Sequence, residues 1–336
     1  MLYVTTRSRT DSYTAYRALH EGIASDGGEF LPIRLPQYTH EQLEAIMSDN
    51  FNETVARILN LFFAVRLTGW DIEFAVGRKP VRLLNMGRKI TVAELWRNTE
   101  ADYSIAARRI YARLCDNLGA QNSPNGWSAI AIRIALLFGV YGELRKQEIY
   151  TFDAAASGKD MQQVMALWYA RNMGLPVGRI LCGCNENCWI WDLTHKGELT
   201  FTAPVQTCTP DLDRIPSGIE RLVYGTLGQE ETIRYLGACA DKASYCLSQE
   251  QLQKLNSGMF SSVVGGRRVM DLIASVYRTN QYLIDPYTAI SYGTLQDYRA
   301  KTGENKLTVL FSEGNPEHFA DVILQATGLP VRDIKK

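Results

Sequence analysis

Residues 94–118 read ELWRNTEADYSIAARRIYARLCDNL, and this stretch decides how the chain is interpreted. Its second part has apolar residues at helical spacing, namely Tyr103, Ala106, Ala107, Ile110, Leu114 and Leu118. Three arginines lie off this stripe, namely Arg108, Arg109 and Arg113. The spacing predicts an amphipathic helix that begins near residue 103. Ser104 then falls in its first turn, with Thr99 and Asp102 placed to cap it.

Strands and helices alternate in the sequence beyond this helix. Strand-like runs occur at 148–153, 178–183, 260–264 and 307–311, and helical patterns at 161–172, 267–278, 286–299 and 318–327. Such alternation predicts an α/β fold with a mainly parallel sheet and helices on both of its faces. The first 90 residues are more helical, and no Gly/Ser/Pro-rich linker follows them. We therefore expect an N-terminal subdomain over 1–90 attached to a larger α/β domain over 91–336.

Charge and composition exclude some classes of partner. The chain has 336 residues, 46% of them hydrophobic, and its 36 Lys and Arg residues balance its 36 Asp and Glu residues. A net charge of zero gives no reason to expect nucleic acid or an anionic membrane as a partner. The most apolar run, 129–140, contains Arg133 and is too short to cross a bilayer, so it reads as a buried helix. We expect a cytoplasmic protein.

A metal site is the first reading that the cysteines suggest. Cys182, Cys184 and Cys188 lie close together in a chain with seven cysteines, and Cys208 or His195 would have to supply a fourth ligand. Their C-x-C-x3-C spacing matches no common zinc pattern. The other histidines are scattered, at His20, His40 and His318. Free thiols are the expectation, and no metal.

Segments along nearly the whole chain resemble threonine synthases, in the order in which that family has them. Residues 3–36 resemble the family's leader, with its STRG-like strand and APDGGLYVP-like turn. Residues 174–199, 209–228 and 282–292 resemble later family segments, the last reading YLIDPYTAISY where the family has YLIDPHTAVG. The resemblance implies the large domain of a fold type II pyridoxal phosphate (PLP) enzyme.

The residues that would handle the cofactor depart from the family's pattern. Residues 94–106 resemble its cofactor-lysine segment, roughly ELFHGPTLAFKDFA, and this register places Ser104 on the lysine. That lysine forms the Schiff base with PLP, and a serine hydroxyl does not form one. Neither Lys89 nor Lys159 stands at the same helix start. The resemblance therefore implies that no cofactor, and in particular no PLP, is bound.

Four further departures lie in the same implied site. The family's inserted cofactor-capping domain has no counterpart near 115–127, where CDNLGAQNSPNG replaces it. In ASGKDM at 156–161, only Gly158 survives of a TGNFGN-like loop that cradles phosphate at a helix start. Glu313 takes the place of a threonine, and Tyr287 that of a histidine.

Candidate ligand-binding residues follow from these segments. They are Ser157, Gly158, Lys159, Asp160, Asp285, Tyr287, Thr288 and Glu313. Lys159 reads as a solvated lysine at a helix start or as an anion ligand, and Glu313 as a paired carboxylate or a general base. Tyr287 reads as a packing residue rather than an acid.

Two functions remain open. The first is a non-catalytic threonine synthase-like protein with a binding, scaffolding or regulatory role, associating with another protein or with itself, its small-molecule ligand unknown. The second is an enzyme with a rebuilt, PLP-independent pocket, or with residual threonine synthase-type PLP lyase activity. No nucleophile, base and orienting group occur together to support it. A crevice filled by Tyr103, Met161 and Tyr287 would oppose the enzyme, and an open pocket with converging polar groups would favour it.

Overall fold

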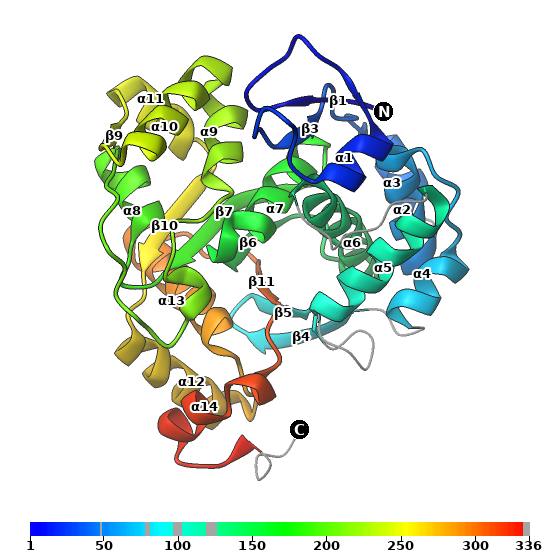
Figure 1. Ribbon diagram of the computed structural model, residues 1–336. Helices are drawn as coiled ribbons and strands as arrows, with labels where there is room; N and C mark the ends of the chain where they lie inside the picture. The colour runs from blue at the N-terminus through cyan, green and yellow to red at the C-terminus, as the bar shows by residue number, and fades with distance from the viewer. Residues whose placement is uncertain (48, 78–80, 97–102, 119–125, 332–336) are drawn as a thin grey trace.

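A six-stranded sheet forms the centre of the computed structural model, which describes residues 1–47, 49–77, 81–96, 103–118 and 126–331 (Figure 1). The strands follow the order β10-β7-β6-β11-β5-β4. Their bounds are β4 Arg82–Gly87, β5 Ile90–Glu94, β6 Phe152–Ser157, β7 Val177–Cys184, β10 Met259–Val263 and β11 Thr308–Ser312. Every pairing is parallel except that of β4 with β5. The predicted α/β class with a mainly parallel sheet is confirmed.

The antiparallel edge pair is a tight hairpin. Arg88 and Lys89 connect β4 to β5, and both have positive φ, 51° and 57°. This conformation matches the twist of the flanking strands. β4 thereby brings residues 82–87, within the first 90 residues, into the main sheet.

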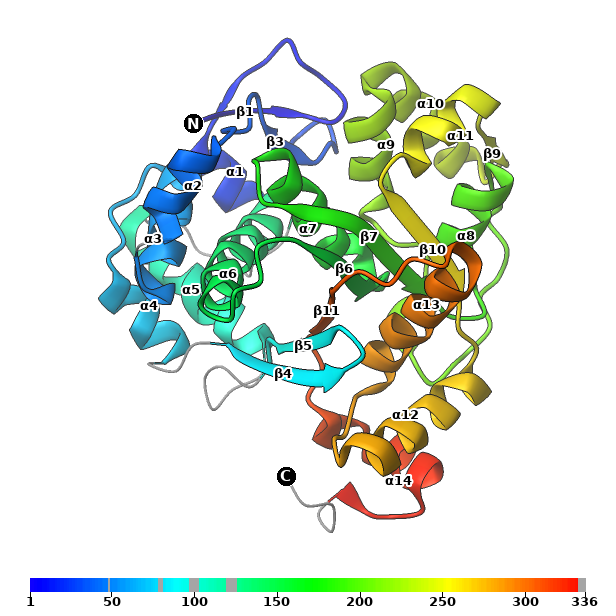
Figure 2. The same ribbon diagram turned by 180° about the vertical axis from the view of Figure 1, so that it is seen from behind.

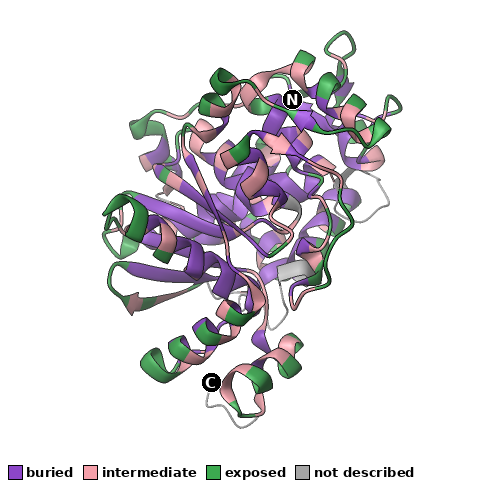
Figure 3. Ribbon diagram, turned by 90° about the vertical axis from the view of Figure 1, so that its left-hand side faces the viewer, coloured by how far each residue is buried: buried purple, intermediate pink, exposed green. Residues whose placement is uncertain are grey.

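Helices cover both faces of the sheet, as predicted (Figure 2). Alternate strand residues divide between two cores: Ala154 and Ala156 belong to one, and Ala155 to the other. The first core contains α6 Gly126–Lys146 and α7 Gln162–Asn172, and the second contains α12 Gly266–Asn280, α13 Pro286–Thr302 and α14 Ala320–Thr327. Figure 3 shows the strands buried between exposed outer helices.

Two sequence predictions need correction. A strand at 148–153 is wrong: the amides of Gln147 and Glu148 bond to the last carbonyls of α6, Glu148 has a φ of 60°, and the strand begins only at Phe152. The left-handed backbone at Glu148 thus ends the helix in a turn. The buried helix inferred from 129–140 extends over all of α6, which is long and apolar enough to cross a membrane, but 83% of the relevant window is buried in the fold.

The N-terminal part packs against α6. Its elements are β1 Leu2–Thr5, β2 Tyr13–Thr14, α1 Ala15–Glu21, β3 Phe30–Pro32, α2 His40–Met47, α3 Phe51–Phe63 and α4 Gly69–Val76. The strands form a small antiparallel sheet in the order β2-β1-β3. Helix α5, Tyr103–Leu118, matches the predicted amphipathic helix, with Ile110 and Leu114 buried. The proposed caps Thr99 and Asp102 lie outside the described residues.

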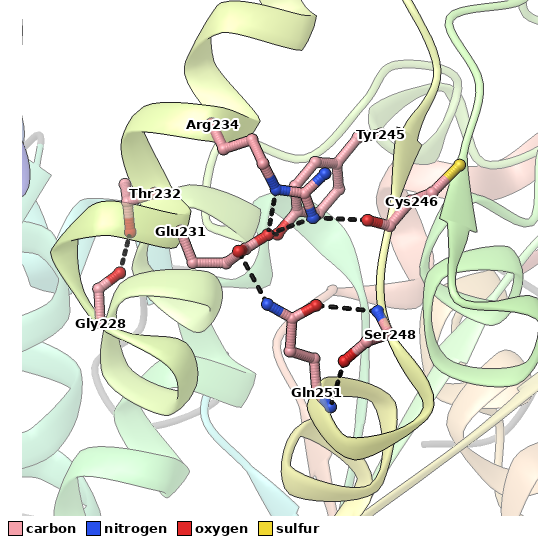
Figure 4. A network of polar contacts seen from close by, with 8 residues as sticks. All are labelled: Gly228, Glu231, Thr232, Arg234, Tyr245, Cys246, Ser248 and Gln251. Carbon is pink, nitrogen blue, oxygen red and sulfur yellow. Dashed lines mark hydrogen bonds and ion pairs between the residues drawn. The ribbon is translucent and has the colours of Figure 1, made fainter.

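A third group of elements, not anticipated from the sequence, lies on the opposite side of the molecule from α2–α4 (Figures 1 and 2). It comprises α8 Trp189–Trp191, η2 Asp192–Lys196, β8 Glu198–Leu199, η3 Pro210–Leu212, α9 Ile219–Leu227, α10 Gln229–Asp241, β9 Tyr245–Cys246 and α11 Gln249–Asn256. Glu231 joins three of these elements (Figure 4). It accepts hydrogen bonds from Arg234, from the Tyr245 hydroxyl at 2.6 Å and from Gln251 at 2.8 Å.

A buried ion pair connects the N-terminal part to α9. Arg221 is 1% exposed, and its Nε lies 2.7 Å from a carboxylate oxygen of Glu29, which is 8% exposed. Arg221 also donates to the carbonyl of Phe30 on β3 at 2.7 Å. Burial raises the pKa of the Glu29 carboxyl, and the charge of Arg221 opposes that rise. The pair therefore fixes α9 against β3.

Removing one charge of this pair should destabilise the fold. We expect Glu29→Gln to lower the free energy of unfolding by about 3 kcal/mol, because it leaves the guanidinium of Arg221 buried without its counter-charge. Urea denaturation measures the change. The matched control is Glu250→Gln, which breaks the exposed Glu250–Lys254 pair and should leave the unfolding midpoint unchanged. Equal midpoints for the two variants would contradict a structural role for the Glu29–Arg221 pair.

Candidate functional site

Polar residues gather at one edge of the central sheet. Because five strands are parallel, their carboxyl ends meet there, and residues that directly follow β6 and β11 become neighbours. Ser157 ends β6, Lys159 follows it in η1 (Lys159–Met161), and Glu313 follows β11. The start of α13 reaches the same edge, since the hydroxyl oxygens of Thr288 and Ser312 lie 2.8 Å apart. The predicted candidates are thus brought together.

Lys159 is partly exposed, but its charge is already paired within the chain. Its Nζ lies 2.8 Å from Oδ2 of Asp211, in η3, and 5.2 Å from the centre of the Tyr287 ring. The Tyr287 hydroxyl donates to the same carboxylate oxygen at 2.9 Å and accepts from the Asp211 amide at 3.2 Å. We call these three residues the Asp211 bridge.

The Asp211 bridge changes the acid–base behaviour of its members. Burial acts to raise the pKa of the Asp211 carboxyl, but the hydrogen bonds from Lys159 and Tyr287 and the lysine's charge outweigh it, so this pKa lies below its usual value. Burial raises the pKa of the Tyr287 phenol well above its usual range. Asp211 is therefore a carboxylate at neutral pH and Tyr287 a neutral donor, which suits packing and pairing rather than proton transfer.

Asp285 and Thr288 stabilise the start of α13. The Asp285 carboxylate is fully buried and accepts from the amides of Tyr287 and Thr288, from the Thr288 hydroxyl and from the Ser312 hydroxyl. Burial raises its pKa, and these hydrogen bonds oppose the rise. This is an N-cap with a proline at the first helical position. The polar atoms of both residues are buried and stabilise the start of the helix.

Glu313 forms an ion pair, which agrees with one of the two interpretations of this residue from the sequence. Its carboxylate lies 3.3 Å from Nε of Arg133, which comes from α6 on the opposite side of the strand end. The side chains are only 19% and 13% exposed. Arg133, the residue that interrupts the apolar run of 129–140, is thus paired with a carboxylate inside the fold.

The loop after β6 is folded tightly onto its neighbours. The amide of Gly158 donates to the carbonyl of Gly183 at 2.7 Å, and a side chain at this glycine would approach that carbonyl to 3.2 Å. Met161 has a φ of 56° and is fully buried, with its sulfur 3.8 Å from that of Cys182. Met161 therefore fills the loop from within, as the sequence suggested.

A small cavity remains between these groups. Its volume is about 40 Å³, and its lining residues are Ala156, Ser157, Lys159, Gln163, Tyr287, Phe311, Glu313, Gly314 and Phe319. Gln163, at the start of α7, is 3% exposed, and neither polar atom of its side chain has a hydrogen-bond partner among the described residues. Cavities that hold drug-sized ligands measure roughly 300–1,000 Å³. This one is nearer the size of one or two water molecules.

Some of the predicted site lies outside the described residues. This holds for the side chains of Tyr103, Ser104 and Asp160, for residues 97–102 of the cofactor-lysine segment and for residues 119–125 of the deletion near 115–127. The structure places the backbone of Ser104 in the first turn of α5, as the spacing predicted.

Three residues of the site escaped the sequence reading. Asp211, Gln163 and Arg133 each come from a segment that was identified, but nothing in their local pattern marked them as neighbours of Lys159 or Glu313. The charged pair Lys159 and Asp211 is 52 positions apart in sequence. A compensating-charge argument would call for an opposite charge near Lys159 and near Glu313, but it does not identify which residue supplies it.

Two of the three clustered cysteines lie in the core, and Cys188 is partly exposed. Cys182 and Cys184 are buried on β7, and burial raises the pKa of Cys182 to about 12 and that of Cys184 also. Within the described parts of the chain, no group of three or more His, Cys, Asp or Glu residues is arranged to hold a metal ion. Such thiols stay protonated at neutral pH and are poor nucleophiles.

Comparisons with known proteins agree with this fold. The family model described as "Threonine synthase N terminus" matches residues 2–77. Threonine synthase-like 1 from Homo sapiens is 24% identical over 229 residues, which cover 65% of this chain but 30% of that protein. Threonine synthase from Pseudomonas aeruginosa is 21% identical over 431 residues, covering 97% of this chain and 90% of that one.

A solved structure extends the likeness to the whole fold. PLP-bound threonine synthase from Brucella melitensis superimposes with a TM-score of 0.87 at 18% identity, over 98% of this chain and 92% of that one. The chain spans less than a third of the human relative it matches. The chain is thus similar to the threonine synthases: the model of their N terminus matches residues 2–77, and the likeness in fold extends over nearly its whole length.

Proposed function

We propose that this threonine synthase-like protein does not use PLP and acts by binding rather than by catalysis. The observation that carries the proposal is the Asp211 bridge. In it the Asp211 carboxylate already pairs with the Lys159 ammonium and accepts from the Tyr287 hydroxyl at the sheet edge. The adjoining cavity of about 40 Å³ is several times smaller than a ligand of PLP's size needs. The residues at this edge therefore do not fit the cofactor.

Two features of the sequence support the same conclusion. In the family register, Ser104 stands at the Schiff-base lysine, and a hydroxyl forms no imine with an aldehyde. The alignment with the Pseudomonas enzyme runs over 431 positions against 336 residues here, so at least 95 positions (431 less 336) face gaps in this chain. A gap of that size is expected if the inserted capping domain is missing. An uncapped crevice would leave reactive intermediates open to water.

A rebuilt enzyme is the second candidate. Gln163 favours it, since an amide with both polar atoms unsatisfied lines the cavity beside Lys159 and Glu313. Against it, both charged groups are already paired, and neither pair forms a nucleophile with an adjacent base.

PLP trapping tests the cofactor claim. With one equivalent of PLP followed by borohydride, we expect no lysine of this chain to become labelled stoichiometrically, because surface amines react only weakly and at random. Peptide mapping by mass spectrometry measures the label at each lysine. Threonine synthase from Pseudomonas aeruginosa, treated in parallel, is the positive control. A single lysine carrying nearly one equivalent would refute the proposal.

Restoring the family lysine alone should not restore catalysis. We expect Ser104→Lys to form no threonine from phosphohomoserine, the reaction that the family resemblance implies, because the Asp211 bridge still fills the site. Threonine is measured by amino-acid analysis after incubation with PLP, with Pseudomonas threonine synthase as control. Threonine production above that of the unsubstituted chain would show that only the lysine was missing.

The Asp211 bridge itself can be opened. We expect Asp211→Asn to speed hydrogen exchange of the amides of 207–213 by about threefold to tenfold, because a partly exposed charged bond is lost. Since the folded-state pKa of Asp211 is lowered, its stabilisation is present above the unfolded value of about 3.9 and is lost as the pH falls through the folded value. The difference between variant and unsubstituted chain should therefore shrink in acid.

Asp271→Asn is the matched control for this exchange experiment. Asp271 lies exposed on α12, so its substitution should leave exchange in 207–213 unchanged. Unaltered exchange in Asp211→Asn would mean that the bridge does not hold the segment closed.

A further inference from the structure

Gln163 is a buried amide at the start of α7. It is 3% exposed, and neither its side-chain oxygen nor its side-chain nitrogen has a hydrogen-bond partner within the parts of the chain that the structure describes. Exchanging the positions of the two atoms changes nothing, because both lack a partner. An unsatisfied amide in the interior of a protein is costly, so this one calls for an explanation.

Gln163 lines the cavity of about 40 Å³ at the sheet edge. The charged groups of that lining are already paired: Nζ of Lys159 lies 2.8 Å from Asp211, and the Glu313 carboxylate lies 3.3 Å from a guanidinium nitrogen of α6. The Tyr287 hydroxyl donates to Asp211 as well. Among the described residues of the lining, Gln163 is therefore the buried polar side chain that still needs partners.

Aromatic rings form much of the wall beside Gln163. Phe311 is 3% exposed, and the rings of Tyr287 and Phe319 meet edge to face with their centres 5.7 Å apart. A buried water molecule typically makes about three hydrogen bonds, and ring carbons offer it none. Water alone is therefore a poor partner for Gln163. A flat group that bonds to the amide and packs against the rings suits both parts of the cavity.

The two unsatisfied atoms determine the chemistry of such a group. The amide of Gln163 presents an acceptor and a donor side by side, so its complement has a donor beside an acceptor, as a primary carboxamide does. An anion lacks the donor, and it would meet the carboxylate of Glu313 in the same lining. A cationic ammonium group lacks the acceptor. A neutral amide adds no charge to a lining whose charges are already paired.

We propose that this cavity binds the primary carboxamide group of a small molecule through a pair of hydrogen bonds to the side chain of Gln163. The cavity admits a group about the size of one or two water molecules, so only the amide end enters it. The rest of the ligand extends toward solvent past Lys159, whose side chain is 39% exposed.

This site rests on the proposed function, since it gives the binding role a ligand class at the same crevice. The two claims fail separately, because the amide is titrated in the absence of PLP. A chain that binds the amide and also takes up PLP would refute the proposed function alone. A chain that takes up neither would refute the amide site alone.

The probe is acetamide. It is compared with acetone, which has nearly the same shape but no N–H donor, and with acetate, which is an anion. The side-chain N–H resonances of Gln163, assigned by their loss in Gln163→Met, report binding in ¹⁵N-labelled protein. We expect saturable binding of acetamide with a Kd of roughly 1–10 mM, as suits so small a ligand, and binding at least about tenfold weaker for acetone and acetate.

Gln163→Met removes the hydrogen-bonding atoms and keeps the approximate length of the side chain. Followed at the backbone amides of 157–165, its affinity for acetamide should fall at least about tenfold. Its urea unfolding midpoint should be unchanged or raised, because an apolar side chain needs no partner in the free protein. Gln162→Met is the matched control. Gln162 is partly exposed and is not one of the residues described as lining the cavity, so its substitution should leave the affinity unchanged.

Four results would overturn the proposal. The absence of a saturable shift at tens of millimolar acetamide would mean that water alone occupies the cavity. Equal affinity for acetone or for acetate would make the site apolar or anion-binding instead. Unchanged affinity in Gln163→Met would place the binding elsewhere on the chain. A clearly lower unfolding midpoint of Gln163→Met would show that Gln163 already has partners in the free protein.

Discussion

The common direction of five sheet strands determines where every polar group of the candidate site lies. Because β5, β6, β7, β10 and β11 run parallel, the loops after them meet at one edge, and charges far apart in sequence become neighbours. In homologues such an edge is where a ligand would be expected. Here Lys159 and Glu313 stand at that edge, and both are only partly exposed, so an opposite charge beside each one offsets the water that it has lost. Asp211 pairs with Lys159, and Arg133 pairs with Glu313.

This internal neutralisation connects the fold to the proposed role. Asp211 reaches Lys159 from the segment before α9, and Arg133 reaches Glu313 from α6, so elements from both sides of the sheet close over its edge. Paired charges inside a protein add little net stability compared with apolar packing, but removing one partner is costly. Ion pairs of this kind would hold the sheet edge in one conformation. This suits a binding protein.

The sequence pattern predicted the elements whose formation depends mainly on the spacing of their own apolar residues. The helix at 103–118 followed from its apolar spacing, and the helical pattern at 286–299 predicted α13. The strand expected at 148–153 failed because apolar residues there belong partly to a turn after α6. The helices of 219–256 were not predicted, although α9 has an apolar face with Ile219, Leu222 and Val223 buried. Asp211 could not be found, because its partner is set by a fold-level contact and not by neighbouring residues.

The central claim is that this crevice is filled by the chain itself and takes up no PLP, covalently or otherwise. Phosphorus NMR of PLP tests it most directly, since the single phosphate resonance reports every bound form. On adding one equivalent of the protein, the account predicts that the resonance keeps the position and width of free PLP. A shifted or broadened PLP resonance that returns to the position and width of free PLP when inorganic phosphate is added would contradict the account. It would place the cofactor's phosphate in a specific site.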